Sequence, residues 1–143
     1  MTEDKPADIA ATAPTGRLSY EPAIDLVSEP DDPSGSRCRW LLEPPPESWS
    51  DFVLSEWELE RIGWTDLHPH DETNIVVEGE LHVECEGETV VVGPRGTVRV
   101  PAGKVGRYWA PVYARMVAVY GPNPSGAKTE YGEYWEIPSE DPV

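Results

Sequence analysis

The chain has 143 residues, the size of one ordinary domain, and it carries 27 acidic against 11 basic side chains, a formal net charge of −16. This charge disfavours nucleic acid and anionic membranes as partners, because both bind through clustered Lys and Arg. No apolar run approaches the roughly 20 residues of a membrane helix, and the N-terminus lacks the basic start and apolar core of a signal peptide. We therefore expect a cytoplasmic protein.

The two ends of the chain differ in character. Residues 1–15 are rich in Ala, Thr, Pro and Asp without an apolar period, which predicts a flexible tail. Residues 16–143 are predicted to form one domain. The two cysteines, Cys38 and Cys85, are too few for a disulfide framework and lack the paired spacing of a zinc site, so we expect both to be reduced and Cys85 to be buried.

Between residues 17 and 46, short apolar pieces alternate with turn-forming residues, which predicts a segment that wraps around the edge of a barrel. From residue 52 onward, apolar and acidic side chains alternate, as in a strand with one face buried and one face in water. The apolar set is Val53, Trp57 and Leu59, and the acidic set is Glu56, Glu58 and Glu60.

A further strand is predicted over residues 65–78, with Gly79 at a bend. Short apolar strands then follow one another, separated by glycine and proline turns and without any helical period, which is typical of a β-sandwich or barrel. Their sequences are LHVEC, TVVV, TVRV, RYW and YARMVAVY. Residues 129–138 are predicted to add one more strand, either to the same barrel or to a partner subunit.

The stretch GWTDLHPHDETNIVVEGE, residues 63–80, concentrates side chains that bind metals or transfer protons. Successive side chains of a strand point to opposite faces, so residues two apart share a face. On one continuous strand, Asp66, His68, His70 and Glu72 would therefore project to the same side. The sequence predicts two imidazoles and two carboxylates at one site.

Two motifs in this region resemble those of the cupin superfamily. The first is His68-Pro-His70 followed by Glu72 and VVEGEL, and the second is GPRGTVRVPAG followed by Gly106, at the position where cupins carry a third His. The resemblance spans about residues 52–124. It implies an all-β fold, a single cupin double-stranded β-helix or jelly-roll barrel, with a site inside the barrel.

The spacing of the first motif departs from the usual cupin pattern, because the Glu lies closer to the His pair than in most members. Counting back from Gly79 places Asp66 and His68 at the usual His positions, in place of His68 and His70. Either pair could face the pocket.

Within the cupins, DETNIVVEGELHVECEGETVVVGPRGTVRVPAG and YARMVAVYGPNP are most similar to EutQ-type ethanolamine-utilisation proteins, which also lack the full histidine set. The resemblance implies a small-molecule-binding cupin.

Three functions fit these residues. The first is a metal-dependent enzyme acting on a small polar or anionic substrate, with Zn, Ni, Mn or Fe held by His68, His70 and Glu72 and with Asp66 as a further ligand. The second is a metal-free isomerase or lyase that uses Asp66, His68, His70 or Glu72 for proton transfer, with Glu72 and His70 as the catalytic candidates. The third is a non-catalytic accessory cupin.

Three further side chains are candidates for binding the substrate: Arg115, Tyr108 and Trp64. Arg115 lies in an apolar strand and must pair with a carboxylate, either from Glu72 or Asp66 or from a ligand. A structural ion pair is the alternative for Arg115, and a core or interface role is the alternative for the aromatics. We also expect a homodimer, because cupins commonly pair through sheet edges.

Overall fold

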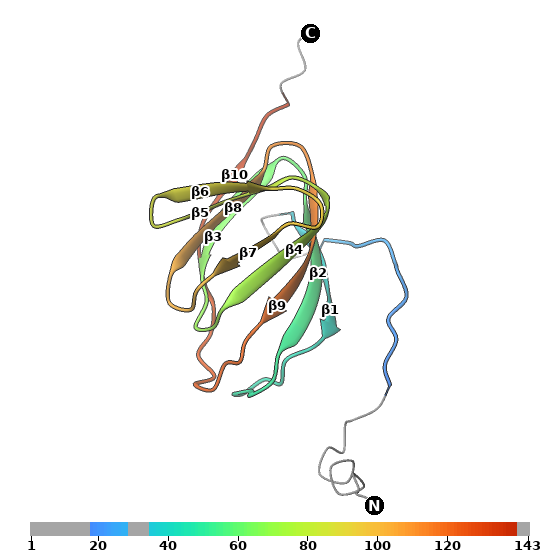
Figure 1. Ribbon diagram of the computed structural model, residues 1–143, viewed down its shortest axis with the longest axis vertical. Helices are drawn as coiled ribbons and strands as arrows, with labels where there is room; N and C mark the ends of the chain where they lie inside the picture. The colour runs from blue at the N-terminus through green and yellow to red at the C-terminus, as the bar shows by residue number, and fades with distance from the viewer. Residues whose placement is uncertain (1–17, 29–34, 140–143) are drawn as a thin grey trace, which may run out of the picture.

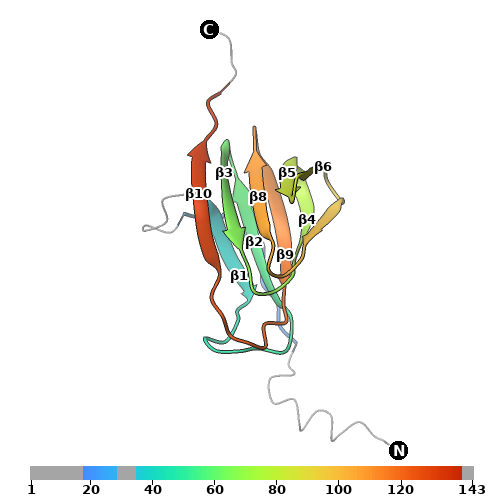
Figure 2. The same ribbon diagram turned by 90° about the vertical axis from the view of Figure 1, so that its left-hand side faces the viewer.

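The computed structural model describes residues 18–28 and 35–139, and the regular elements in this part of the chain are all β-strands. Two five-stranded sheets face each other as two layers (Figures 1 and 2). The described residues contain no helix long and apolar enough to cross a membrane. The strands are β1 (Arg37–Leu42), β2 (Val53–Leu59), β3 (Ile62–Leu67), β4 (Glu72–Gly79), β5 (Leu81–Cys85), β6 (Glu88–Val92), β7 (Thr97–Val100), β8 (Val105–Ala110), β9 (Ala114–Tyr120) and β10 (Glu130–Glu136).

The order of the strands is that of a jelly roll. The first sheet has the order β1-β2-β9-β4-β7 and the second has the order β10-β3-β8-β5-β6, with antiparallel pairing throughout. Apart from β1–β2 and β5–β6, each strand is followed by one in the opposite sheet, so the chain winds around a common interior. The predicted all-β jelly-roll barrel is confirmed. The strand expected near residues 129–138 is β10, which pairs with β3 of the same chain.

The interior is filled by inward-facing side chains of both sheets. Leu59, Leu81, Met116 and Tyr108 are fully buried there, and each aliphatic side chain contributes about 1.5–3 kcal/mol by leaving water. Cys85, expected to be buried, is only half-buried against this core, and neither cysteine forms a disulfide with another described residue. The predicted alternation of strand β5 thus places its apolar side chains in the core. The predicted tail, residues 1–15, lies outside the described residues.

Gly79 ends β4 in a conformation that favours glycine. Its φ angle is +78°, and a Cβ atom at this position would lie 2.1 Å from the carbonyl oxygen of Tyr113. Any other residue would combine a left-handed backbone with a steric clash. The bend predicted at Gly79 therefore has a physical cause, and it directs the chain from the first sheet into β5 of the second.

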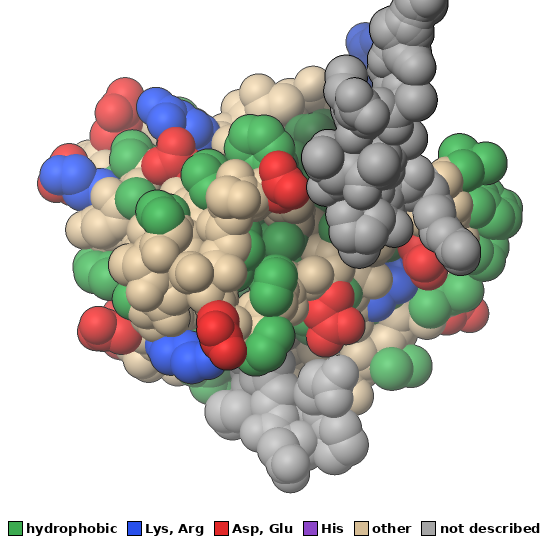
Figure 3. Space-filling view, turned by 90° about the horizontal axis from the view of Figure 1, so that it is seen from below, with side chains coloured by type: hydrophobic (Ala, Val, Ile, Leu, Met, Phe, Trp, Pro, Cys, Tyr) green, Lys and Arg blue, Asp and Glu red, His purple; other side chains and the backbone are tan. Residues whose placement is uncertain are grey.

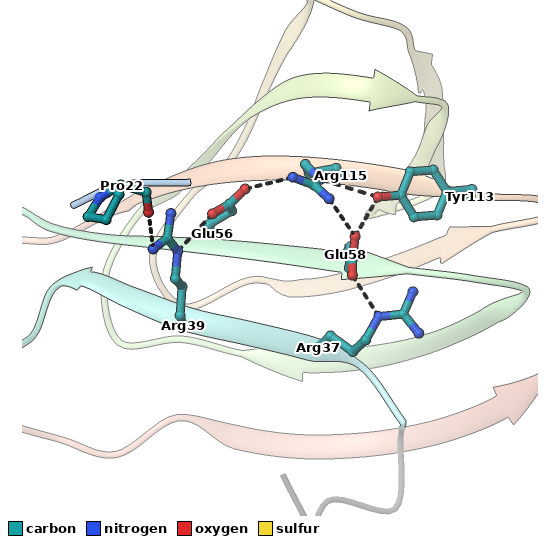
Figure 4. A network of polar contacts seen from close by, with 7 residues as sticks. All are labelled: Pro22, Arg37, Arg39, Glu56, Glu58, Tyr113 and Arg115. Carbon is teal, nitrogen blue, oxygen red and sulfur yellow. Dashed lines mark hydrogen bonds and ion pairs between the residues drawn. The ribbon is translucent and has the colours of Figure 1, made fainter. Parts of the chain in front are cut away.

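The outer face of β2 does not lie in water as predicted. Glu58 is only 6% exposed, because strand register places Arg37 of β1 and Arg115 of β9 directly opposite it. Its carboxylate accepts hydrogen bonds from the Tyr113 hydroxyl and, at 2.6 Å, from Arg37 Nε. Glu56 is likewise bound by Arg39 Nε at 2.9 Å (Figure 4). Cross-strand ion pairs of this kind hold strands in register.

Candidate functional site

The four predicted ligand residues lie where the chain passes from β3 to β4. β3 ends at Leu67 and β4 begins at Glu72 in the opposite sheet, so the continuous strand predicted over residues 65–78 is wrong. The break contains Pro69, which has no backbone N–H to donate to a strand ladder. Residues 68–71 form a short bend. The predicted alternation of side chains between the two faces of one strand therefore does not continue across it.

The bend is anchored to β7 and to the loop between β7 and β8. The Asp71 carboxylate accepts hydrogen bonds at 2.8 Å from the backbone N–H of Ala102 and from Arg99. The carbonyl oxygen of His68 accepts a hydrogen bond of 2.9 Å from the backbone N–H of Gly103. These contacts fix the backbone on both sides of His70, and with it the direction of the site side chains.

Three side chains converge across the bend, and we call them the buried cluster: Asp66, His68 and Glu72. His68 Nε2 lies 2.9 Å from Glu72 Oε1 and 3.3 Å from Asp66 Oδ2. The second ring nitrogen, Nδ1, lies 2.6 Å from the hydroxyl oxygen of Thr129. The imidazole is thus held at both nitrogens, with one of them between two carboxylates.

Glu72 is itself held by polar groups beneath it. Oε1 accepts a hydrogen bond of 2.9 Å from the Tyr108 hydroxyl, and Oε2 accepts one of 2.9 Å from the Asn74 amide. Asn74 in turn accepts a hydrogen bond of 2.7 Å from the Trp57 indole. All four side chains are buried. Because both oxygens of Glu72 are bonded, its carboxylate is fixed in one orientation.

These contacts set the protonation of the cluster. Burial would lower the pKa of His68, but the hydrogen bonds and charges of Asp66 and Glu72 outweigh it and raise the pKa to about 10. Burial would raise the pKa of Glu72, yet the contacts from His68, Asn74 and Tyr108 lower it below its usual value. Burial together with the charge of Glu72 raises the pKa of Asp66. The cluster therefore holds an imidazolium between two carboxyl groups of unequal acidity.

His70 lies beside the buried cluster but is not part of it. Its ring stacks on that of His68 with 4.7 Å between ring centroids, and it packs against Trp49 at 5.2 Å. Nδ1 lies 3.0 Å from the carbonyl oxygen of Asp71, so it is the protonated nitrogen of the ring. Burial lowers the pKa of His70, which favours the neutral ring with an unprotonated Nε2.

The cluster lines a cavity of about 760 Å³ between the two sheets. A cavity of this volume accommodates a small organic molecule. Residues of β1, β2, β3 and β10 and of the loops that follow β1 and β9 form its walls. The aromatic lining residues are Trp40, Trp49, Trp57, Trp64, Tyr120, Tyr131 and Tyr134.

The three predicted substrate-binding residues have different positions. Trp64 lines the cavity, and its indole N–H donates a hydrogen bond of 3.3 Å to Asp66. Tyr108 lies beneath Glu72 and is fully buried, so it supports the site from below. Arg115 points to the outer face of the first sheet, where it contacts Glu56 at 3.3 Å and Glu58 at 3.4 Å (Figure 4). Its expected pairing with Glu72 or Asp66 is replaced by this structural ion pair.

Several residues that shape the site were not found from the sequence. Thr129 contacts His68 from a loop 61 positions along the chain, and Asn74 is an isolated amide in an apolar strand. Tyr120, whose ring packs against both histidines, lies at the end of an apolar strand. Asn74 lies two residues after Glu72 within β4, so the two side chains point to the same face of the strand. This spacing is a weak indication in the sequence that Asn74 belongs to the site.

Gly106, which the cupin resemblance places where a third His is expected, lies on β8. It pairs with Asp66 across β8 and β3, and a Cβ atom there would lie 2.7 Å from the ring and hydroxyl of Tyr108. Real Cβ contacts are never so short, so a side chain at residue 106 would displace the tyrosine. The Tyr108 ring thus fills the space above Gly106 and presents its hydroxyl to Glu72.

The buried cluster also fits a metal ion in its arrangement of donors. Asp66, His68 and Glu72 each offer one ligand atom, and these atoms lie within 4.8 Å of one another. One imidazole and two carboxylates are a donor set that Mn, Fe or Zn accepts. His70, predicted as a ligand, does not belong to this group of atoms.

Comparisons with known proteins agree with the fold. Residues 56–120 match the Cupin domain family, and no curated protein sequence gives a significant match. EutQ from Salmonella typhimurium LT2 is 24% identical, with a TM-score of 0.53 over 64% of this chain and 73% of that chain. The Clostridium difficile EutQ protein is 19% identical, with a TM-score of 0.58 over 70% and 75%. Ectoine synthase from P. lautus is 22% identical, with a TM-score of 0.56 over 78% and 85%.

At these identities the solved structures share the fold with this chain, whereas the domain match rests on the sequence itself. The match covers β2 from Glu56 onward and ends with β9, the part of the barrel that carries the buried cluster. Together the two findings show that residues 56–120 match the Cupin domain family and that the barrel shares its fold with solved cupin structures, EutQ proteins among them.

Proposed function

We propose that this cupin binds a small organic molecule in its cavity and transfers a proton to or from it through the buried cluster. One observation carries the proposal: His68 Nε2 is held 2.9 Å from Glu72 and 3.3 Å from Asp66 at the wall of a cavity of about 760 Å³. A histidine in contact with a carboxylate and open to a ligand site is the arrangement of a general acid or base.

The geometry gives the members of the cluster different roles. Glu72 is bonded by Tyr108, Asn74 and His68, so it stays ionised and orients the imidazole. The contact of His68 with Asp66 is longer than its contact with Glu72. A ligand atom that replaces the contact with Asp66 therefore costs the smaller loss of interaction energy. In this scheme the imidazolium of His68 donates its Nε2 proton to the ligand. Neutral His70 faces the same ring, and its unprotonated Nε2 offers the acceptor for a proton that the ligand gives up.

A divalent cation at the same place is the second candidate, favoured by the three ligand atoms within 4.8 Å. Asp66, His68 and Glu72 would hold it, and the ion would supply a Lewis acid for a bound oxygen atom. Binding requires an unprotonated His68 nitrogen, so the cation and the imidazolium compete for one position. The two candidates are therefore mutually exclusive states of the cluster.

The first experiment separates the candidates on the untreated wild-type protein. Elemental analysis should find no stoichiometric metal, and the ring ¹⁵N signals of His68 should show both nitrogens protonated at neutral pH. One equivalent of Zn, Mn or Fe that is lost in His68→Ala and kept in His82→Ala would establish the metal site instead. His82 is a matched control because it lies on β5, outside the cavity.

The second experiment tests ligand binding itself, in the presence of a chelator. A panel of small metabolites is screened by the shift in unfolding temperature of wild type, His68→Gln and His82→Gln. The proposal expects at least one compound that stabilises wild type and His82→Gln but not His68→Gln. It fails if no compound binds, or if every binder is indifferent to His68. For a compound that reacts, turnover should survive the chelator and disappear in Glu72→Gln.

A further inference from the structure

We infer that the ligand of the cavity is an organic cation, a molecule with an ammonium group on a small apolar body. This inference rests on the proposed function, because it names the class of ligand for the same cavity. Three features of the described lining support it: its aromatic walls, its excess of acidic groups and its few unengaged hydrogen-bond donors.

Aromatic rings approach the buried cluster from two directions. On one side Trp64 packs against Trp57 with 5.2 Å between ring centroids. On the other side Tyr120 lies 5.8 Å from Trp40 and 5.6 Å from the His68 ring. Ring faces carry a negative quadrupole that attracts cations, and several rings around one space are the usual way to bind an ammonium group.

The net charge of the cavity lining is negative, which also favours a cation. Arg39, a basic lining residue, is engaged by Glu56 at 2.9 Å and by the carbonyl oxygen of Pro22 at 2.8 Å, on the outer side of β1. Among the described lining residues, Lys128 is then the basic side chain that remains to offset the acidic ones. The acidic groups stay in excess even when His68 is counted as positive. The acidic lining residues are Glu47, Asp66, Glu72 and Glu133, the last of which pairs with Arg107.

Acidic side chains are also spread over the face of the molecule seen in Figure 3. With a net charge of −16, the whole chain attracts cations and repels anions before any contact forms. An anionic substrate would therefore meet an unfavourable potential both outside the cavity and within it.

Most donors near the buried cluster already have partners, which argues against a neutral sugar. A sugar site needs unspent donors as well as acceptors, since each hydroxyl buried without a partner costs binding energy. The lining near the cluster offers chiefly carboxylate oxygens and ring faces. The engaged donors are the indole N–H groups of Trp57 and Trp64, the amide of Asn74 and one of the two hydroxyls of Ser55 and Tyr120, which share a hydrogen bond.

The test compares choline with 3,3-dimethylbutan-1-ol, its uncharged isostere, in which carbon replaces nitrogen. Binding to the full-length protein is measured by calorimetry and tryptophan fluorescence at constant ionic strength, with isovalerate and glucose as anionic and neutral comparisons. We expect choline to bind at millimolar concentrations and the isostere to bind about tenfold more weakly, the size of a desolvated cation–π contribution.

Two pairs of variants locate the binding. Trp40→Leu should weaken choline binding severalfold, whereas Trp135→Leu should not, because Trp135 lies under Arg107 outside the cavity. Trp40 is 45% exposed on an edge strand, so its replacement should leave the fold intact. Glu72→Gln should also weaken binding, whereas Glu88→Gln, an exposed change of equal charge on β6, should not.

The outcomes separate this inference from the proposed function. If isovalerate or glucose binds in the cavity while choline does not, the inference of a cationic ligand is wrong. The proposal that the cavity binds a small molecule then still stands. Equal affinity for choline and its isostere would likewise overturn the inference, because charge would then contribute nothing. If none of the four probes binds, the inference falls, and the metabolite screen with His68→Gln decides the proposed function separately.

Discussion

The state of His68 yields a prediction for the pH dependence of stability. A histidine whose pKa rises from 6.5 to about 10 on folding binds its proton more tightly in the folded protein. Its contribution to stability is therefore complete below pH 6.5 and is lost as the pH rises towards 10. The free energy of unfolding should fall by about 1.4 kcal/mol per pH unit in this window, and by roughly 5 kcal/mol across it.

The measurement is urea unfolding of chelator-treated protein at several pH values, followed by tryptophan fluorescence. In His68→Gln, which keeps a donor for Glu72 but cannot titrate, the slope between neutral pH and pH 9 should nearly disappear. His82→Gln should retain the wild-type slope, because His82 lies outside the cluster. Parallel curves for wild type and His68→Gln would refute the reasoning, as would an NMR titration midpoint for His68 near 6.5.

Three further substitutions test individual contacts by urea or thermal unfolding. Tyr108→Phe removes the hydroxyl that binds buried Glu72 and should lower the free energy of unfolding by about 1–3 kcal/mol; an unchanged value would mean that the hydroxyl contributes nothing. Gly106→Ala places a Cβ 2.7 Å from the Tyr108 ring and should cost about 1–3 kcal/mol, and wild-type stability would contradict this. Arg115→Gln should lower the free energy of unfolding by about 1–3 kcal/mol, because it deprives Glu58 of a cation, and it should leave ligand binding unchanged. Unchanged stability together with weakened ligand binding would mean that Arg115 contributes to the ligand site.

The fold was predictable because its signals are local. Alternating apolar side chains and glycine turns lie within a few residues of each other, and they report a half-buried strand wherever it pairs. Glu58 shows where this reasoning stops. Its alternation with Trp57 and Leu59 predicts two faces, but the arginines that bury its carboxylate come from β1 and β9. The neighbours of a strand are not encoded in its own periodicity.

The structure brings together three of the four predicted ligand residues, but not in the way that the strand pattern predicts. Asp66 and Glu72 meet because the chain bends between two sheets, whereas the parity argument assumed one strand. The cupin spacing counted from Gly79 favoured Asp66 and His68, and these are the residues that join Glu72. The contact of Thr129 with His68 spans 61 positions, so no local pattern could have indicated it.

Gly106 and Tyr108 explain why the site differs from the cupin pattern that the sequence resembles. They lie two residues apart on β8, and the missing side chain of the first gives the ring of the second its space. A histidine at residue 106 would offer a nitrogen to a metal ion, whereas the Tyr108 hydroxyl offers a proton to Glu72. Because burial and the charge of Glu72 raise the pKa of Tyr108, this hydroxyl stays protonated and remains a donor. The donors of Tyr108 and Asn74 add to the contact with His68, which comes first among the interactions that lower the pKa of Glu72, so the carboxylate and the imidazolium stabilise each other's charge.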